Sequence, residues 1–475
     1  MAGRDTYLVI GGSGFVGRHI VLQLQERGDS VSVFDIVQRY HDAPFYSGDI
    51  CEQDQVANAV RKVCGSLALV VPYTDIAKSG ATCIIHTASP PHGMNDPALY
   101  FKINVDGTKA VIAAAVECGV KKLVYTSSAG VVFNGTDLNG VDERIPYPEK
   151  AMDAYNESKC KGEEAVLAAN GKGGLYTVAL RPAGIFGPGD RQVMTGFHQV
   201  YENGQTHFQL GDNNNLFDWT YVGNVAKAHL HAADRLLDPP PAPPLISSED
   251  EKVPLDPPGL TEAEQAMINY PLPPISLTTG AMNRIPTSAA RPLGPYVERP
   301  PNGDALEAAF RAPYDARESN RPVMRTRFDQ LSDYNLSRQK LAHPTQPSPL
   351  SVAGQVFFIT NGEPTYFWDF GRMIWRELDK IFPGKRDPAK VGKYFRLSKD
   401  LAMIAAAGAE WVGYFRGKEA TFTRFRVTFS CATRWHDIEK ARRVLGYEPE
   451  VGVEEGIKRM IEWWKTEFVD SQKAQ

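Results

Sequence analysis

Short apolar runs alternate with longer amphipathic stretches over roughly the first 180 residues of the chain. The short runs are rich in β-branched and aromatic residues, which predicts buried strands, whereas the longer stretches repeat apolar residues at helical spacing. The predicted strands are Tyr7–Ile10, Ser30–Phe34, Thr82–Ala88, Lys122–Ser127 and Thr177–Arg181. The predicted helices are Phe15–Gln25, Gln53–Cys64, Ala98–Cys118 and the one that carries Tyr155. This rhythm predicts an α/β fold with a Rossmann-type, doubly wound parallel sheet and a ligand crevice at the carboxyl ends of its strands.

Residues 238–350 break this rhythm. They hold 21 of the chain's 34 prolines, and proline at this density removes amide donors and blocks regular helix and sheet. We expect a proline-rich, partly disordered insertion with one helix near Arg327–Leu341, and an inert linker is favoured over a functional lid. Periodic structure returns in a strand and two helices, at Gln355–Thr360, Tyr366–Ile381 and Val453–Glu467.

The pattern therefore divides the chain into three parts. Residues 1–182 form the predicted Rossmann domain, and residues 238–350 form the insertion. Residues 183–237 and 351–470 form a smaller C-terminal substrate-binding region that is interleaved with the sheet.

One apolar segment, from Leu397 to Phe415, contains charged residues and is too short to span a bilayer easily. Its Trp411, Tyr414 and Phe415 precede Arg416 and Lys418, a composition that suits the membrane interface. A helix of the substrate-binding region explains the segment equally well.

Composition narrows the class of protein. The net charge of -4 gives no basic footprint for nucleic acid. The six cysteines form no C-x-x-C pair, which favours a reducing compartment. The first strand begins within seven residues of the N-terminus and leaves no room for a signal peptide, and no run of about 18 uncharged apolar residues predicts a spanning helix.

Three glycines follow the first predicted strand at the spacing G-x-x-G-x-x-G, namely Gly11, Gly14 and Gly17. A strand, a glycine turn and a helix N-terminus in succession form a binding site for the pyrophosphate of a dinucleotide. The second strand ends in Asp35, whose carboxylate can accept hydrogen bonds from the adenosine ribose and repels a 2′-phosphate. NAD is therefore favoured over NADP, although the nearby Arg39 keeps NADP possible.

Tyr155 and Lys159 form Y-x-x-x-K, which puts both side chains on one face of a helix. A nearby ammonium stabilises a phenolate and lowers the tyrosine pKa, so that the tyrosine can take a proton from a substrate hydroxyl as hydride leaves the same carbon. Ser128, at the end of the preceding strand, can hydrogen-bond the same oxygen. Without a catalytic role, Ser128 is a turn residue at a strand end, and Tyr155 and Lys159 are an exposed pair on a helix.

Several motifs together resemble the extended short-chain dehydrogenase/reductases. They are GGSGFVG at 11–17, HTASP at 86–90, NVDGT at 104–108, TSSAG at 126–130, YNESK at 155–159 and RPAGIFGPGD at 181–190. Later motifs resemble the 3β-hydroxysteroid dehydrogenase branch of that family, namely FDWTYVGNVAKAHLHA at 217–232, FFITNGEPTYFWDF at 357–370 and KARRVLGY at 440–447. The resemblance covers about 1–237 and 351–470, and the insertion departs from the compact family pattern.

This resemblance implies roles for individual residues. Ser128, Tyr155 and Lys159 match the catalytic triad. The matching cofactor-binding positions are Gly11, Gly14, Phe15, Val16, Gly17, Asp35, Asp49, Ile50, Ala88, Tyr155, Lys159 and Pro182. Asn104 matches a further polar contact or a helix-packing residue, while His86, His229 and His231 lack metal-ligand context and are expected to be structural.

The resemblance implies NAD-dependent oxidation of the 3β-hydroxyl of a sterol, in particular a 4α-carboxysterol that then loses carbon dioxide without a metal. One alternative is a dehydrogenase or reductase of another steroid or terpenoid alcohol. Another is a nucleotide-sugar epimerase or dehydratase, but Gly184 stands where those enzymes usually have Asn. A non-enzymatic NAD-binding regulatory protein is disfavoured because Ser128, Tyr155 and Lys159 are all present.

An apolar substrate implies a location near membranes. We expect peripheral attachment to the cytosolic face of the endoplasmic reticulum membrane. A homodimer or a sterol-demethylation complex stays open.

Overall fold

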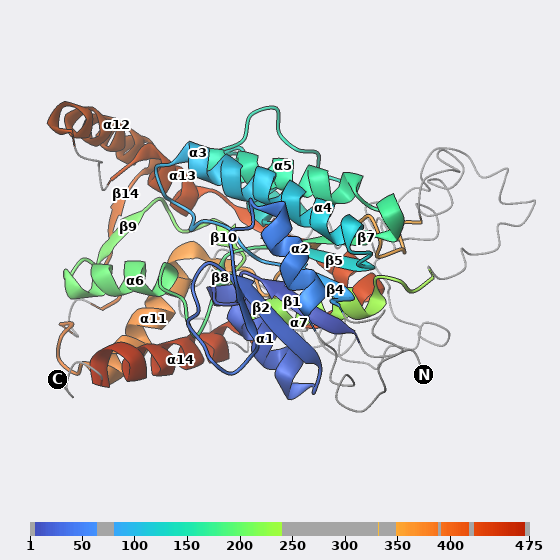
Figure 1. Ribbon diagram of the computed structural model, residues 1–475. Helices are drawn as coiled ribbons and strands as arrows, with labels where there is room; N and C mark the ends of the chain where they lie inside the picture. Colours follow the sequence, from blue (N-terminus) through green and yellow to red (C-terminus); the bar gives the residue numbers. More distant parts are fainter. Residues whose placement is uncertain are drawn as a thin grey trace, which may run out of the picture.

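The computed structural model describes residues 5–63, 80–239, 331, 348–387, 391–417 and 422–470 (Figure 1). Its centre is a seven-stranded sheet in the order β12-β7-β5-β4-β1-β2-β3, in which all neighbouring strands are parallel. The strands are β1 (Thr6–Ile10), β2 (Ser30–Asp35), β3 (Phe45–Ser47), β4 (Cys83–His86), β5 (Lys122–Thr126), β7 (Tyr176–Pro182) and β12 (Val356–Ile359). The strand order reverses between β1 and β4, where open α/β sheets bind ligands. The predicted doubly wound parallel sheet is confirmed.

Helices cover both faces of the sheet, because its central strands are apolar on both sides. Helices α2, α4 and α5 cover one face and α1 and α7 the other (Figure 1). Their bounds are α1 (Phe15–Glu26), α2 (Gln53–Lys62), α4 (Thr108–Glu117), α5 (Ala154–Ala168) and α7 (Val222–Arg235).

The single helix predicted for 98–118 is built from three segments. They are α3 (Pro97–Phe101), a π-helical turn η2 (Lys102–Gly107) and α4. The π turn contains Asn104, which is fully buried and donates from Nδ2 to Ser158 Oγ of α5 at 2.9 Å. Apolar periodicity does not reveal such a turn, because one extra residue per turn changes the pattern very little.

The smaller region packs beside the carboxyl ends of the central strands (Figure 1). It contains a four-stranded sheet of order β13-β10-β15-β6 and the strand pairs β11-β8 and β14-β9. Its strands are β6 (Leu138–Val141), β8 (Ile185–Phe186), β9 (Phe208–Leu210), β10 (Leu216–Phe217), β11 (Thr220–Tyr221), β13 (Thr365–Tyr366), β14 (Phe395–Leu397) and β15 (Arg434–His436). Its helices are α6 (Val193–Glu202), α11 (Phe367–Ile381), α12 (Lys399–Arg416), α13 (Arg424–Cys431) and α14 (Val453–Trp464). Short helical turns occur in both parts of the chain, at η3 (Ala129–Val132), η4 (Lys172–Gly174), η8 (Ala441–Leu445) and η9 (Lys465–Asp470).

The strand predicted at Gln355–Thr360 is β12, and it pairs in parallel with β7. Residues that follow the insertion therefore complete one edge of the central sheet. The short edge strand β3 was not predicted, because three half-exposed residues give no clear alternation. The helix expected near Arg327–Leu341 and almost all of the insertion lie outside the described residues.

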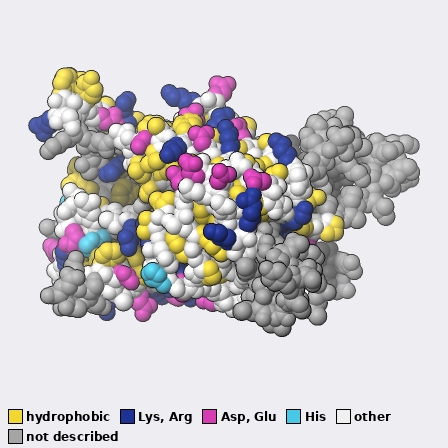
Figure 2. Space-filling model, viewed as in Figure 1, with side chains coloured by type: hydrophobic (Ala, Val, Ile, Leu, Met, Phe, Trp, Pro, Cys, Tyr) yellow, Lys and Arg dark blue, Asp and Glu magenta, His cyan; other side chains and the backbone are white. Residues whose placement is uncertain are grey.

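Helix α12 projects from the body at the end of the smaller region (Figure 1). Its buried Ala402 and Ala406 pack with Val427 of α13. The opposite side exposes large apolar residues, with Trp411 68% exposed and Phe415 67% exposed. Figure 2 shows hydrophobic side chains gathered at the outer end of this helix, next to basic ones. None of the helices in the described part of the chain has the length and apolarity needed to cross a bilayer.

Candidate active site

The glycine turn between β1 and α1 brings three backbone segments into close contact. Gly11 has φ +83°, and a Cβ there would lie 2.7 Å from the backbone nitrogen of Ala88, which follows β4. A Cβ at Gly17 would lie 2.2 Å from the carbonyl oxygen of Gly11. Gly14 is the N-cap of α1 and supplies no side-chain cap. The first amide groups of α1 therefore stand over a tight turn and suit a pyrophosphate.

Asp35 lies at the end of β2, beside this turn. Its Oδ2 accepts from the backbone N–H of Ser13 at 3.0 Å, and its Oδ1 accepts from Ile36 N–H at 2.7 Å. Each carboxylate oxygen can accept further hydrogen bonds, so the geometry fits two ribose hydroxyls. Arg39, the residue that kept NADP possible, is exposed a few residues further on.

The other predicted cofactor positions surround the same crevice. Phe15 and Val16 are partly buried in the first turn of α1. Asp49 Oδ1 accepts from Cys51 N–H at 2.9 Å, and the buried Ile50 packs against the π turn, where a Cβ at Gly107 would lie 2.6 Å from its side chain. Pro182 is buried at the end of β7.

Tyr155 lies in the first turn of α5, and Lys159 follows one turn later on the same side. Lys159 is buried, its Nζ donates to the carbonyl oxygen of Thr126 at 2.5 Å, and it lies 4.4 Å from the centre of the Tyr125 ring. Ser128 follows β5 and accepts the Gly130 N–H at 3.0 Å. The structure therefore brings together the tyrosine, the lysine and the strand-end serine that the sequence singled out.

Tyr155 and Lys159 both have pKa values that differ from the ordinary values of their side chains. Burial raises the pKa of Tyr155 to about 12, and hydrogen bonds from Ser89 and Ser128 lower it only in part. Burial also lowers the pKa of Lys159 to about 7, although the Glu163 carboxylate opposes this shift. The lowered tyrosine pKa that we expected from a neighbouring ammonium is therefore not found in the chain alone. The reason is that desolvation penalises the phenolate more than two serine hydroxyls stabilise it.

Buried polar contacts fix the helix that carries Tyr155. Arg181 of β7 donates from Nη2 to Glu163 Oε1 at 2.5 Å, and both side chains are almost fully buried. Asn104 reaches Ser158, whose Oγ donates to the carbonyl oxygen of Tyr155 at 2.8 Å. Of the two roles left open for Asn104, the structure displays the helix-packing one.

Four residues beside Tyr155 were not singled out from the sequence. Ser89 hydrogen-bonds to the tyrosine, and the rings of His92 and Tyr100 lie 4.7 and 5.4 Å from its ring. Asp153 is the N-cap of α5 and its Oδ2 lies 3.0 Å from His92 Nε2. Ser89 lies within the quoted HTASP motif, and an N-cap search would find Asp153. No local pattern connects the two aromatic residues to Tyr155.

Two of the three histidines that we expected to be structural are buried in the protein. His86 and His229 are fully buried, and burial lowers their pKa values to about 3 and about 4, so both are neutral. His229 Nε2 lies 2.7 Å from Thr126 Oγ1. Across the described ranges, no group of three His, Cys, Asp or Glu residues could hold a metal ion.

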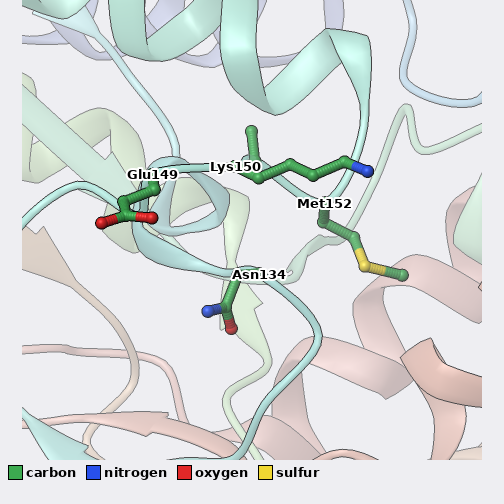
Figure 3. A pocket seen from close by; sticks show the side chains of 5 residues that line it. Asn134, Glu149, Lys150 and Met152 are labelled. Carbon is green, nitrogen blue, oxygen red and sulfur yellow. The ribbon is translucent and has the colours of Figure 1, made fainter.

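A surface pocket lies on the loop that precedes α5. It is lined by Asn134, Glu149, Lys150, Ala151 and Met152. Figure 3 shows the Glu149 carboxylate and the Lys150 ammonium pointing away from each other. These side chains do not converge on one point, so the pocket has no catalytic arrangement of its own.

Residues 8–249 match the model of the 3-beta hydroxysteroid dehydrogenase/isomerase family. The sterol-4-alpha-carboxylate 3-dehydrogenase (decarboxylating) of Saccharomyces cerevisiae is 35% identical over 97% of this chain and 97% of its own length. The protein of the same name in Schizosaccharomyces pombe is 36% identical over 98% of each chain. The human protein of that name is 40% identical over 48% of this chain and 57% of its own length.

Solved structures share the fold at low sequence identity. The crystal structure of gox2253 has a TM-score of 0.57 and 18% identity, covering 98% of this chain and 99% of its own. The UDP-glucose 4-epimerase of Thermotoga maritima, solved with UDP-glucose, has a TM-score of 0.52 and 16% identity over 97% of this chain and 99% of its own. An NAD-bound short-chain dehydrogenase/reductase from Agrobacterium tumefaciens has a TM-score of 0.53 and 15% identity over 98% and 99%. At these identities the likeness concerns the fold alone.

Proposed function

The chain belongs to the 3-beta hydroxysteroid dehydrogenase/isomerase family, and on that premise we propose that it oxidises the 3β-hydroxyl of a 4α-carboxysterol with NAD, with loss of the carboxyl group as carbon dioxide. One observation carries the proposal. The chain matches sterol-4-alpha-carboxylate 3-dehydrogenases along nearly its whole length, and in it a hydrogen bond joins Tyr155 to Ser128, with Lys159 one helical turn away. The reaction belongs to sterol biosynthesis.

Tyr155 acts as the base in this mechanism. Ser128 and Ser89 orient the substrate hydroxyl, and the phenolate oxygen takes its proton. NAD, when bound, would supply the hydride acceptor and a positive charge that favours the Tyr155 phenolate. The glycine turn, the first amides of α1 and Asp35 would hold this cofactor. Lys159 lies one turn from Tyr155 and adds its own charge whenever it is protonated.

Decarboxylation needs little more from the protein. The oxidation product is a β-keto acid, so when the bond from C4 to the carboxylate breaks, its electron pair moves into the new C3 carbonyl. Tyr155, which now carries the proton, donates a hydrogen bond to the developing enolate oxygen. Protonation of the enolate at C4, with a proton from water, then gives the 3-ketone.

Gly184 argues against a nucleotide-sugar substrate. It has φ +37°, and a Cβ there would lie 2.4 Å from the carbonyl oxygen of Asp218 and 2.7 Å from the Phe217 ring. An asparagine at this position would clash with both, so the polar sugar contact usual in the epimerases and dehydratases has no place here.

A direct assay tests the proposed function. Purified protein is incubated with NAD and a 4α-carboxy-3β-hydroxysterol, and NADH and carbon dioxide are followed together. We expect equal amounts of both products. NADH without carbon dioxide would limit the reaction to oxidation, and neither product would overturn the proposal.

Cofactor choice is tested at Asp35. We expect Asp35→Ala to raise the Kd for NAD at least about tenfold and to raise that for NADP much less, because charge-assisted hydrogen bonds to the ribose are lost while the repulsion of a 2′-phosphate disappears. Titration of both cofactors measures this. Asp35→Asn is the matched control, since it keeps one acceptor. Equal NAD and NADP affinity in the unmodified protein would contradict the ribose assignment.

We also propose that the protein attaches peripherally to a membrane, in keeping with the expected endoplasmic reticulum location. A sterol acid resides mainly in a bilayer, and α12 presents exposed Leu401, Ile404 and Trp411 to the surroundings. Basic residues flank this face, with Lys399 at its start and Arg416 at its end. An apolar face with basic neighbours suits an interface that contains anionic lipid. Lys418, which strengthened the expectation, lies outside the described residues.

A further inference from the structure

His92 lies directly beside the catalytic tyrosine, on the loop that follows β4. Its ring centre is 4.7 Å from that of Tyr155 with the planes at 62°, and 5.6 Å from that of Phe425 in α13. The side chain is 31% exposed. His92 therefore lies beside both the Tyr155 ring and the Phe425 ring of α13.

Asp153 fixes the orientation of this imidazole. Asp153 Oδ2 lies 3.0 Å from His92 Nε2, while its Oδ1 accepts the Asn156 N–H at 2.7 Å. A carboxylate only accepts, so Nε2 carries a proton and the ring is held by the start of α5. Within the described part of the chain no hydrogen bond to Nδ1 is found, so this nitrogen is available to a ligand.

Two other polar side chains near Tyr155 are already engaged by the protein. The Tyr100 hydroxyl donates to the carbonyl oxygen of Pro91 and accepts the N–H of Met94, both at 2.8 Å. Lys159 donates to the Thr126 carbonyl. Asp153 would repel an anion that approached without an intervening positive charge. A protonated His92 supplies that charge between Asp153 and an incoming carboxylate.

We propose that His92 is the specificity-determining residue that binds the 4α-carboxylate of the substrate through Nδ1. The inference rests on the proposed function. The carboxylate is attached to the carbon next to the one that bears the hydroxyl, so it must lie within a few ångströms of the group that Tyr155 deprotonates. With a carboxylate on each ring nitrogen, the imidazole carries both protons and bridges the two anions. Loss of carbon dioxide removes this contact and favours release of the ketone.

The test compares two substrates in His92→Gln and in the unmodified protein. One substrate is a 4α-carboxy-3β-hydroxysterol, and the other is the same sterol with a 4α-methyl group, both presented in the same detergent micelles. We expect the ratio of kcat/KM for the acid to kcat/KM for the methyl sterol to fall at least tenfold, mainly through KM for the acid. The Kd for NAD should stay unchanged. If the methyl sterol is not oxidised, its inhibition constant against the acid replaces its kcat/KM.

His92→Arg is the rescue variant, because a guanidinium keeps the positive charge and should restore most of the preference for the acid. An equal fall for both substrates would overturn the inference and give His92 a role only in packing Tyr155. An unchanged ratio would also overturn it. If the unmodified protein releases no NADH from the acid, the proposed function itself fails, which is a distinct result.

Discussion

Replacing Tyr155 by Phe is expected to lower kcat about a thousandfold while the Kd for NAD changes less than twofold. In the proposed mechanism the phenol oxygen is the proton acceptor, and loss of a general base costs about 10²–10⁴ in rate. The ring remains, so its contacts with His92 and Tyr100 are kept. NADH production by the variant measures the first effect, and quenching of protein fluorescence by NAD measures the second.

Two further variants separate the role of Tyr155 from the roles of its neighbours. Lys159→Ala should weaken both turnover and NAD binding, because in the proposed mechanism a protonated Lys159 would add positive charge near Tyr155 and would contact the nicotinamide ribose. Ser89→Ala should lower turnover by a smaller factor than Tyr155→Phe, since Ser128 remains as the second hydroxyl partner. Substantial activity in Tyr155→Phe would show that the base is elsewhere.

The parts of the fold that sequence predicted well are those with a strong local signal. The strands from Tyr7, Ser30 and Lys122 are short apolar runs between polar turns, and they pair as the alternation requires. The glycine turn was recognisable because Gly11 and Gly17 are needed where backbone approaches backbone. Tyr155 and Lys159 were found together because helical spacing alone puts them on one side of α5.

What the sequence did not reveal depends on contacts between distant residues. His92 and Asp153 are 61 residues apart, and only the fold brings them together. The raised pKa of Tyr155 results from burial among side chains such as His92 and Tyr100, and burial at one position cannot be inferred from a four-residue spacing. The Arg181–Glu163 pair is also a tertiary feature, since strand β7 and helix α5 each look ordinary alone.

Helix α12 shows a different limit of prediction from the sequence. Its apolar composition was evident, and both an interfacial helix and a core helix explained it. The structure shows which residues point outward, because small Ala402, Ala406 and Gly413 face the body while Trp411 and Phe415 are exposed. Small residues on the packed side allow close contact with α13, so the large ones have no partner surface in the described chain.

The double variant Trp411→Glu, Phe415→Glu is expected to lower binding to phosphatidylcholine–phosphatidylserine vesicles at least tenfold, measured by flotation. The two aromatic side chains are lost from the apolar face, and two negative charges are added beside anionic lipid. Folding should survive, because neither side chain is buried, and NAD affinity should be unchanged. Tyr176→Glu, Leu237→Glu is the matched control: it adds the same two charges at partly exposed apolar positions outside α12, so it should float like the unmodified protein. If the unmodified protein and the α12 variant float equally, or if neither floats, α12 is not the anchor and its role is confined to packing on α13.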